Sequence, residues 1–228
     1  RRSAARGAHA QGRRCHGGEA ARELEASGAV DLDEDAAAFV EKLAGDRRSL
    51  ERGRVIEADL LACGGAVPGF RGTLFPFQAA GTVFLASRGR ALLADDMGLG
   101  KTVQAIAAAH ALMQREEAGR ALVVCPASLK RQWADEIARF TRRSAAVVSG
   151  MRAARRALYA PGPEFTIANY EIVLRDADLI AGAGYDLLIV DEAQRIKNWR
   201  TRTAEAVKSS PAPLVFGLTG TPLENRLD

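Results

Sequence analysis

A glycine-rich loop at residues 95–102, with the sequence DDMGLGKT, is the first candidate for a functional site. It follows an apolar run and opens a helical pattern, which is the context that a phosphate-binding loop requires. Small residues let backbone N–H groups surround an anion, and the new helix directs its positive N-terminal end at the same place. Lys101 adds a full charge, and Thr102 offers a hydroxyl to Mg²⁺. The loop therefore predicts a triphosphate site, although the general pattern begins with Gly where this chain has Asp95.

A second motif separates this prediction from the alternative of a loop that only caps a helix. Residues 185–194, YDLLIVDEAQ, form an apolar strand pattern that ends in two carboxylates. Ligands of an open parallel sheet bind at the carboxyl ends of its strands, so both acids are expected on the side of the phosphate loop. Asp191 would hold Mg²⁺ opposite Thr102, and Glu192 would orient the water that attacks the γ-phosphate. Alone, such a pair also caps helices; together with Lys101 it favours a metal site.

A third motif, Thr219-Gly220-Thr221, follows the apolar run 214–218. Its hydroxyls are expected at the same edge of the sheet, where they could bond to the acidic motif and respond to the γ-phosphate. On its own the segment also fits an ordinary turn.

The apolar pattern after residue 70 predicts the strands and helices that carry these motifs. Strands are predicted at 90–94, 121–125, 145–148, 165–168, 187–190 and 214–218, with helices at 77–87, from Lys101 onward and from Leu129 to Phe140. Strands that alternate with helices predict an α/β fold, a parallel sheet with helices on both faces. His110 lies on the apolar face of its helix and is predicted to be packed rather than a ligand.

The preceding residues have a different composition. Residues 1–18 hold five arginines and no acid, which predicts a disordered Arg/Ala/Gly-rich tail; a transit peptide or a nucleic-acid-binding arm is the alternative. Residues 19–69 are expected to form a helical N-terminal segment of two or three short helices and a linker, with the boundary at the glycine-rich stretch 63–69. The main domain is then 70–228, and both ends suggest a fragment of a longer protein.

Composition excludes some classes. The formal net charge of +4 permits a polyanionic partner, and the three scattered cysteines oppose a disulfide framework or a zinc site. No apolar run reaches the roughly 18 residues that span a bilayer. A reducing cytoplasm fits best, and the Ala/Arg/Gly bias suggests a bacterial source.

Four ordered segments carry a resemblance to a known family. Residues 95–102, 124–133 (VCPASLKRQW), 191–198 (DEAQRIKN) and 218–225 (LTGTPLEN) resemble the first RecA-like lobe of a Swi/Snf-type ATPase of helicase superfamily two. The spelling MGLGKT and the IKN after the acidic pair distinguish it from DEAD-box RNA helicases, and Asp95 is what this family shows. The resemblance covers about residues 70–228 and implies a three-layer RecA-like P-loop NTPase lobe with a central, mainly parallel sheet.

The resemblance also implies site residues. ATP and Mg²⁺ would bind at Asp96, Met97, Gly98, Leu99, Gly100, Lys101, Thr102 and Asp191. Gln78, in FPFQ, stands where the family reads the adenine edge, with Phe75 where Arg is usual. Gln194 would couple the acidic motif to Thr219, Gly220 and Thr221.

For DNA the resemblance implies Ser128, Lys130, Asn169, Tyr170, Lys197 and Asn198. Backbone N–H groups where a helix begins, with Ser128 and Lys130, suit phosphates. Trp133 has the spacing of a core residue. The arginines at 142–143 and 152–156 fit either a wider DNA surface or a solvated face.

The implied function is ATP-driven translocation along double-stranded DNA, with remodelling of protein–DNA complexes in a nucleoid. A second lobe would supply arginines for hydrolysis, so the lobe alone should have little ATPase activity. The alternatives are a P-loop NTPase that acts on RNA or other complexes, and a non-catalytic scaffold lobe.

Overall fold

The computed structural model describes residues 34–159, 162–196, 201–208 and 210–220. The chain divides into two compact units, residues 1–48 and 49–228. Of the first unit the structure describes residues 34–48, the beginning of helix α2 (Glu34–Ala62). The predicted tail at 1–18 lies outside the described residues.

A six-stranded sheet, parallel throughout, forms the centre of the second unit. The strands are β1 (Arg90–Leu93), β2 (Ala121–Cys125), β3 (Ala145–Val147), β4 (Phe165–Asn169), β5 (Leu187–Val190) and β6 (Leu214–Leu218), in the order β1-β6-β5-β2-β4-β3. The predicted strands and the α/β class with a parallel sheet are therefore confirmed. The last strand of the described chain inserts between the first and the fifth.

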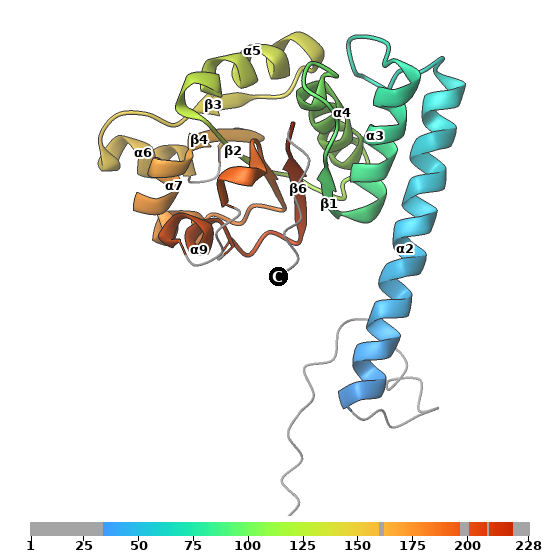
Figure 1. Ribbon diagram of the computed structural model, residues 1–228, viewed down its shortest axis with the longest axis horizontal. Coiled ribbons are helices and arrows are strands. Elements are labelled where there is room, and N and C mark those ends of the chain that lie inside the picture. Colours follow the sequence, from blue (N-terminus) through green and yellow to red (C-terminus); the bar gives the residue numbers. More distant parts are fainter. Residues whose placement is uncertain (1–33, 160–161, 197–200, 209, 221–228) are drawn as a thin grey trace, which may run out of the picture. The chain divides into compact units, whose positions relative to one another are not determined.

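Helices cover both faces of this sheet (Figure 1). One layer consists of α3 (Pro76–Arg88), α4 (Lys101–Gln114) and α5 (Lys130–Phe140). The 3-10 turn η1 (Ala127–Leu129) precedes α5. The other layer consists of α6 (Arg152–Tyr159), α7 (Tyr170–Arg175), α8 (Ala177–Ala181) and α9 (Arg202–Lys208). Strand residues alternate between the two cores: Val123 and Ile189 face the first, whereas Val124 and Val190 face the second. The predicted three-layer arrangement is present.

Helix α2 is continuous from Glu34 to Ala62, whereas the sequence predicts two or three short helices in this region. Gly53 explains part of the difference. A Cβ atom there would lie 3.0 Å from Ser87 Cβ, so glycine permits close packing of α2 on α3. Ile56 and Leu60 are buried in the first core. No helix among the described residues has the length and apolar character that a membrane span needs.

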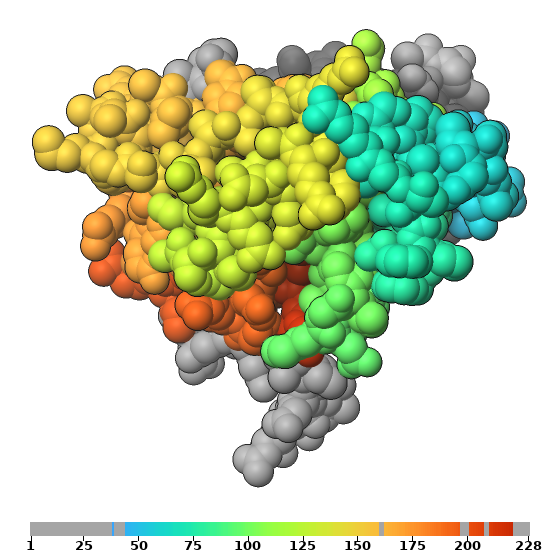
Figure 2. Space-filling model, turned by 90° about the horizontal axis from the view of Figure 1, so that it is seen from above, coloured from blue at the N-terminus to red at the C-terminus, as the bar shows by residue number. Residues whose placement is uncertain are grey.

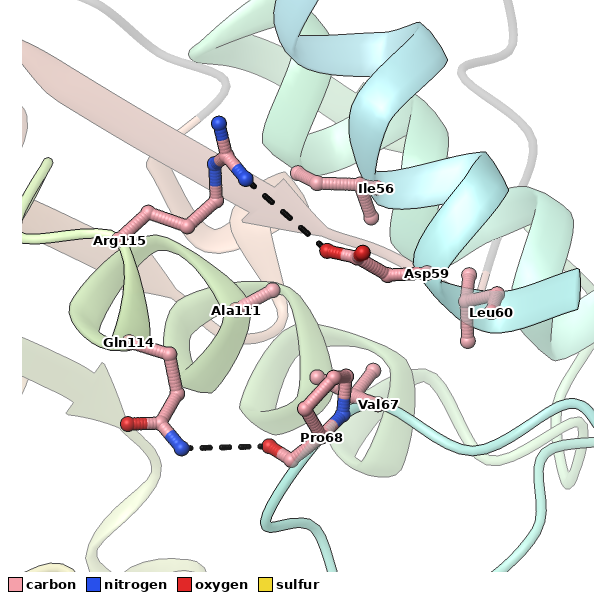
Figure 3. Close-up of a pocket in the computed structure, with 8 residues that line it drawn as sticks. All are labelled: Ile56, Asp59, Leu60, Val67, Pro68, Ala111, Gln114 and Arg115. Carbon is pink, nitrogen blue, oxygen red and sulfur yellow. Dashed lines mark hydrogen bonds and ion pairs between the residues drawn. The ribbon is translucent and has the colours of Figure 1, made fainter. Parts of the chain in front are cut away.

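A hollow of about 320 Å³ lies between α2 and the end of α4 (Figure 3). Ile56, Leu60 and Val67 form its apolar wall, and Arg115 lies 3.9 Å from the Asp59 carboxylate.

A buried ion pair secures the second helical layer. Arg155 on α6 donates to both carboxylate oxygens of Asp176, at 2.6 and 2.8 Å, and the Tyr159 hydroxyl donates to the same group at 3.1 Å. Asp176 is completely buried, and the hydrogen bond from Arg155 holds the pKa of its carboxyl below the usual value. Arg152 also pairs with Asp176, so two arginines of the run 152–156 bind acids of the same protein.

We expect Asp176→Asn to lower the free energy of unfolding by about 3 kcal/mol, because it leaves Arg155 without its partner. The matched control Asp178→Asn removes an acid that is 66% exposed and should change stability by less than about 0.5 kcal/mol. Because the pKa of Asp176 is depressed, its contribution is present above the unfolded pKa and is lost as the pH falls through the folded pKa. Urea unfolding at several pH values measures both effects, and equal losses in the two variants would contradict the assignment.

Candidate nucleotide and nucleic-acid site

The predicted phosphate loop joins β1 to α4 at the carboxyl edge of the sheet. Gly98 and Gly100 have φ values of 84° and 71°, in the left-handed region that favours glycine. Gly100 is the residue before α4, and Lys101 and Thr102 begin that helix. The Lys101 amine donates to the carbonyl oxygens of Asp95, at 2.9 Å, and Asp96, at 2.8 Å. The loop thus curls around the amine that would meet a phosphate.

Two glutamine side chains hold this loop. Gln104, which is completely buried in α4, donates to the Asp95 carboxylate and to the Leu99 carbonyl, each at 3.2 Å. Gln78 on α3 donates to the same Leu99 carbonyl at 3.3 Å, and its own oxygen accepts the Phe75 N–H at 3.1 Å. Sequence reasoning gave Gln78 a base-reading role and missed Gln104. The available signal was a polar residue in the otherwise apolar pattern of α4.

A hollow of about 460 Å³ opens beside the loop, between α3 and β1. Its walls are mainly apolar and include Phe77, Phe84, Leu92 and Leu99. The ring of Phe77 also stacks on Phe75, with centroids 5.8 Å apart.

The acidic pair follows β5 in a tight turn. Asp191 accepts hydrogen bonds from the Trp133 indole N–H and from the Glu192 N–H, both at 2.9 Å. Burial raises the pKa of the Asp191 carboxyl, the Trp133 bond opposes this, and the nearby Glu192 charge adds to it. Glu192 has a φ of 53°, in the left-handed region that residues other than glycine seldom adopt.

Trp133 is 1% exposed, so its predicted place in the core is confirmed. Its bond to Asp191 is an additional role that helical spacing alone does not reveal.

The turn after β6 joins the loop to the acidic pair. Thr219 donates from its hydroxyl to the Gln194 oxygen at 2.8 Å, and the Gln194 amide donates to the Glu192 carboxylate. A Cβ atom on Gly220 would lie 2.8 Å from Met97 Cγ and 3.5 Å from Lys101 Nζ. The three motifs therefore meet, as Figure 2 shows for the green loop beside the orange and red segments. Thr221 lies outside the described residues.

The residues expected to contact DNA have different surroundings. Ser128 is exposed in η1, and the Lys130 amine donates to the Val148 carbonyl at 2.9 Å. Asn169, the last residue of β4, is 8% exposed, and Tyr170, the first residue of α7, is 5% exposed. Lys197 and Asn198 lie outside the described residues.

Tyr170 turns inward, and its hydroxyl donates to the Asp191 carbonyl oxygen. Burial raises the pKa of this hydroxyl, so it keeps the proton that it donates. Asn169 bonds to Glu171. Tyr170 therefore fastens the start of α7 to the acidic turn, whereas the bond of Asn169 stays within its own segment.

Two side chains of the candidate site offer the type of ligand atom that Mg²⁺ prefers. A hydroxyl on Thr102 and a carboxylate on Asp191 are hard oxygen ligands, which this ion prefers. No group of three or more His, Cys, Asp or Glu side chains within the described ranges could hold a metal. The site therefore fits an ion that takes its remaining ligands from phosphate and water.

Comparison with known proteins agrees with this geometry. The family model described as "SNF2-related domain" matches residues 77–228. The chain is 33% identical over 178 residues to the chicken "DNA repair and recombination protein RAD54B", covering 70% of this chain and 19% of that protein. It is 34% identical over 167 residues to the yeast "ISWI chromatin-remodeling complex ATPase ISW1", covering 68% of this chain and 15% of that protein.

A solved structure, "Sulfolobus solfataricus SWI2/SNF2 ATPase core in complex with dsDNA", superimposes with a TM-score of 0.63 at 31% identity. The alignment covers 69% of this chain and 34% of that one. The alignments thus cover between 15% and 34% of the length of these proteins.

We expect Gln104→Met, which roughly keeps the volume but removes the donor, to speed amide hydrogen exchange in the segment 96–100 by about thirtyfold, because two hydrogen bonds of about 1 kcal/mol each are lost. Gln114→Met, at the exposed end of the same helix, is the control and should leave these amides unchanged. Unaltered exchange in the Gln104 variant would show that the loop holds its shape without this side chain.

Proposed function

The chain belongs to the SNF2-related family as the first RecA-like lobe of a helicase superfamily two ATPase, and from this premise we propose that it binds ATP·Mg²⁺ in a double-stranded DNA translocase that remodels protein–DNA complexes. The observation that carries the proposal is the meeting of three motifs at the ends of the adjacent strands β1, β6 and β5. Relatives of this chain include, by their names, a DNA-repair protein and a chromatin-remodelling ATPase.

In the proposed mechanism, Lys101 exchanges the carbonyls of Asp95 and Asp96 for phosphate oxygens. Backbone N–H groups at residues 97–102 would surround the β-phosphate. Thr102 and Asp191 would hold Mg²⁺, which neutralises charge on the transferred phosphoryl group. Gln78 and the apolar hollow beside Phe77 would receive the base.

Glu192 would position the attacking water, and the Gln194–Thr219 hydrogen bond is placed to respond to the γ-phosphate. Ser128 and Lys130, with Lys197 and Asn198, would contact one DNA strand. Through the Tyr170 hydroxyl, the segment after β4 could pass a shift at the DNA to the acidic turn. We propose a cytoplasmic, DNA-associated location for this activity.

Two alternatives remain testable. A P-loop NTPase that acts on RNA would be stimulated by RNA rather than by duplex DNA. A scaffold lobe that does not use ATP would keep its cellular function after Lys101→Ala. The presence of Lys101, Thr102, Asp191 and Glu192 argues against this alternative.

For nucleotide binding, we expect Lys101→Ala to weaken the affinity of the 228-residue chain for Mg²⁺·ATP by tenfold or more, roughly one charge-assisted contact. Glu192→Gln should change it by less than about twofold, because this residue is assigned to the water rather than to the nucleotide. Titration with a fluorescent ATP analogue measures both. Equal weakening by the two changes would contradict the separate roles.

For turnover, we expect the chain alone to hydrolyse ATP slowly with or without duplex DNA, because the arginines that stabilise phosphoryl transfer come from a second lobe. The same chain followed by such a lobe should be stimulated by duplex DNA more than by single-stranded DNA or RNA. Phosphate release measured with each polymer provides the test, and rapid DNA-stimulated turnover by the 228 residues alone would refute it.

A further inference from the structure

A further hollow, lined mainly by polar residues, lies at the opposite edge of the sheet from the phosphate loop. It has a volume of about 630 Å³, and its lining includes Arg71, Arg142, Arg143, His110, Gln114 and Glu164. Arg143 shortly precedes β3 and Glu164 immediately precedes β4, so both lie at the amino ends of parallel strands. The loop and the acidic pair follow the carboxyl ends. The hollow is therefore separate from the nucleotide site.

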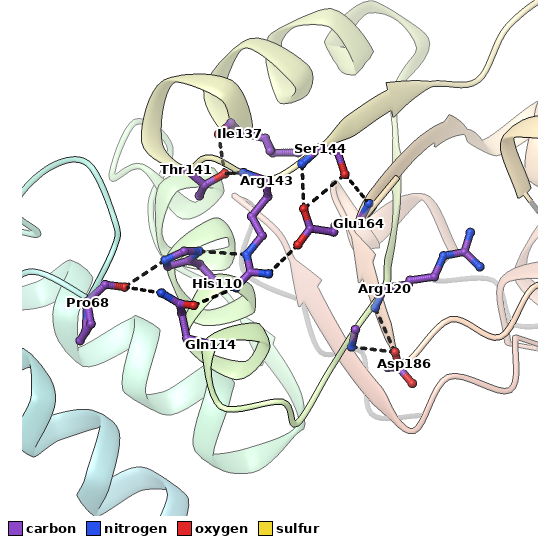
Figure 4. Close-up of polar contacts among 11 residues, drawn as sticks. Pro68, His110, Gln114, Arg120, Ile137, Thr141, Arg143, Ser144, Glu164 and Asp186 are labelled. Atoms are coloured by element: carbon purple, nitrogen blue, oxygen red, sulfur yellow. Dashed lines mark hydrogen bonds and ion pairs between the residues drawn. The ribbon is translucent and has the colours of Figure 1, made fainter. Parts of the chain in front are cut away.

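The inner wall of this hollow is held in place by its own contacts (Figure 4). Arg143 donates to the Glu164 carboxylate at 2.5 Å, to the Gln114 oxygen at 3.2 Å and to His110 Nδ1 at 3.4 Å. With Nδ1 accepting, His110 Nε2 carries the proton and donates to the Pro68 carbonyl at 3.0 Å. His110 is neutral in this arrangement, and it is packed as the sequence predicts.

The charge that remains in the hollow is positive. Glu164 is engaged by Arg143 and by the Ser144 N–H and hydroxyl. Arg71 and Arg142 are exposed, and within the described ranges neither forms an ion pair with an acid. The one side-chain bond of Arg71 to a described residue is long, 3.4 Å to the Ala138 carbonyl. Three guanidinium groups against one carboxylate leave two positive charges.

The two exposed arginines are neighbours because the Arg71 N–H bonds to the Phe140 carbonyl at 2.7 Å, two residues before Arg142. Beside them the wall is apolar, since the Phe70 ring stacks on Phe140 with centroids 5.3 Å apart. Gly69 also lines the hollow with a φ of 76°, and a Cβ atom there would lie 2.7 Å from Gln114 Nε2. Glycine therefore permits the close approach of this part of the rim to Gln114.

We propose that this hollow binds the phosphate group of a small phosphorylated molecule, with Arg71 and Arg142 as its ligands and the Arg143 network as its inner wall. Guanidinium groups match the oxygens of a phosphate in pairs, and a dianion balances the two excess charges. The volume falls within the range of about 300–1,000 Å³ for small-molecule sites. Duplex DNA instead needs a row of cations along its backbone. Arg142 and Arg143 thus serve this site rather than the DNA surface considered from the sequence.

The test uses the whole chain carrying Lys101→Ala, which weakens binding at the phosphate loop by about tenfold or more. Inorganic pyrophosphate and ADP are titrated separately by calorimetry, while amide chemical shifts are followed at Gly69, Arg71 and Arg142. We expect saturable binding, weakened about tenfold by Arg71→Ala or Arg142→Ala and lost in the double variant. Tighter binding of ADP would identify a nucleotide, and equal binding would identify a simpler phosphate ester.

Arg156→Ala is the matched control, because Arg156 is an exposed arginine on α6 outside the hollow. It should leave binding unchanged, and thermal unfolding should confirm that every variant is folded. The proposal is overturned by equal weakening in the control or by the absence of saturation at about 10 mM ligand. It is also overturned if duplex DNA displaces pyrophosphate from the same amides, since the surface then belongs to a nucleic acid.

Discussion

The order of the strands is the constraint on which the candidate site depends. Three motifs spread over more than a hundred residues of the chain can share one phosphate only if their strands are neighbours and end at the same level. Pairing of Leu93 with Leu218 and of Val190 with Gly217 achieves both. Every strand pair in the described sheet is parallel, so the loops after β1, β6 and β5 emerge on one edge. The sheet brings these loops together, and the side-chain hydrogen bonds among them then fix the distances between their residues.

The sequence predicts the elements well and their arrangement less well. Apolar runs locate the strands because a parallel sheet is buried on both faces, and the glycine-rich loop is readable because its backbone needs residues without a side chain. Strand order cannot be read this way, since the insertion of β6 between β1 and β5 results from packing between distant segments. The continuity of α2 was missed for the same reason, because the contact of Gly53 with Ser87 is tertiary.

Within the site, sequence patterns identify residues by their motif and not by the direction of their side chains. Gln104 was overlooked because it lies on the buried face of α4, and Trp133 was recognised as core without its bond to Asp191. Tyr170 was assigned to DNA, yet its hydroxyl reaches the acidic turn. Trp133 belongs to the first core and Tyr170 to the second, and all three residues form hydrogen bonds to the candidate site. The same buried side chain can therefore fill a core and hold a residue of the candidate site in place.

The bonds of Lys101 to the carbonyls of Asp95 and Asp96 have a consequence for discrimination. These oxygens occupy the amine as phosphate oxygens would, so any incoming anion competes with the loop itself. A ligand that offers a single weakly held oxygen gains little from this exchange. A polyphosphate that also engages the backbone N–H groups and a metal replaces both carbonyls at once. In the proposed ATP site the loop would therefore compete with the ligand for the Lys101 amine, and a triphosphate would overcome this competition better than a small anion would.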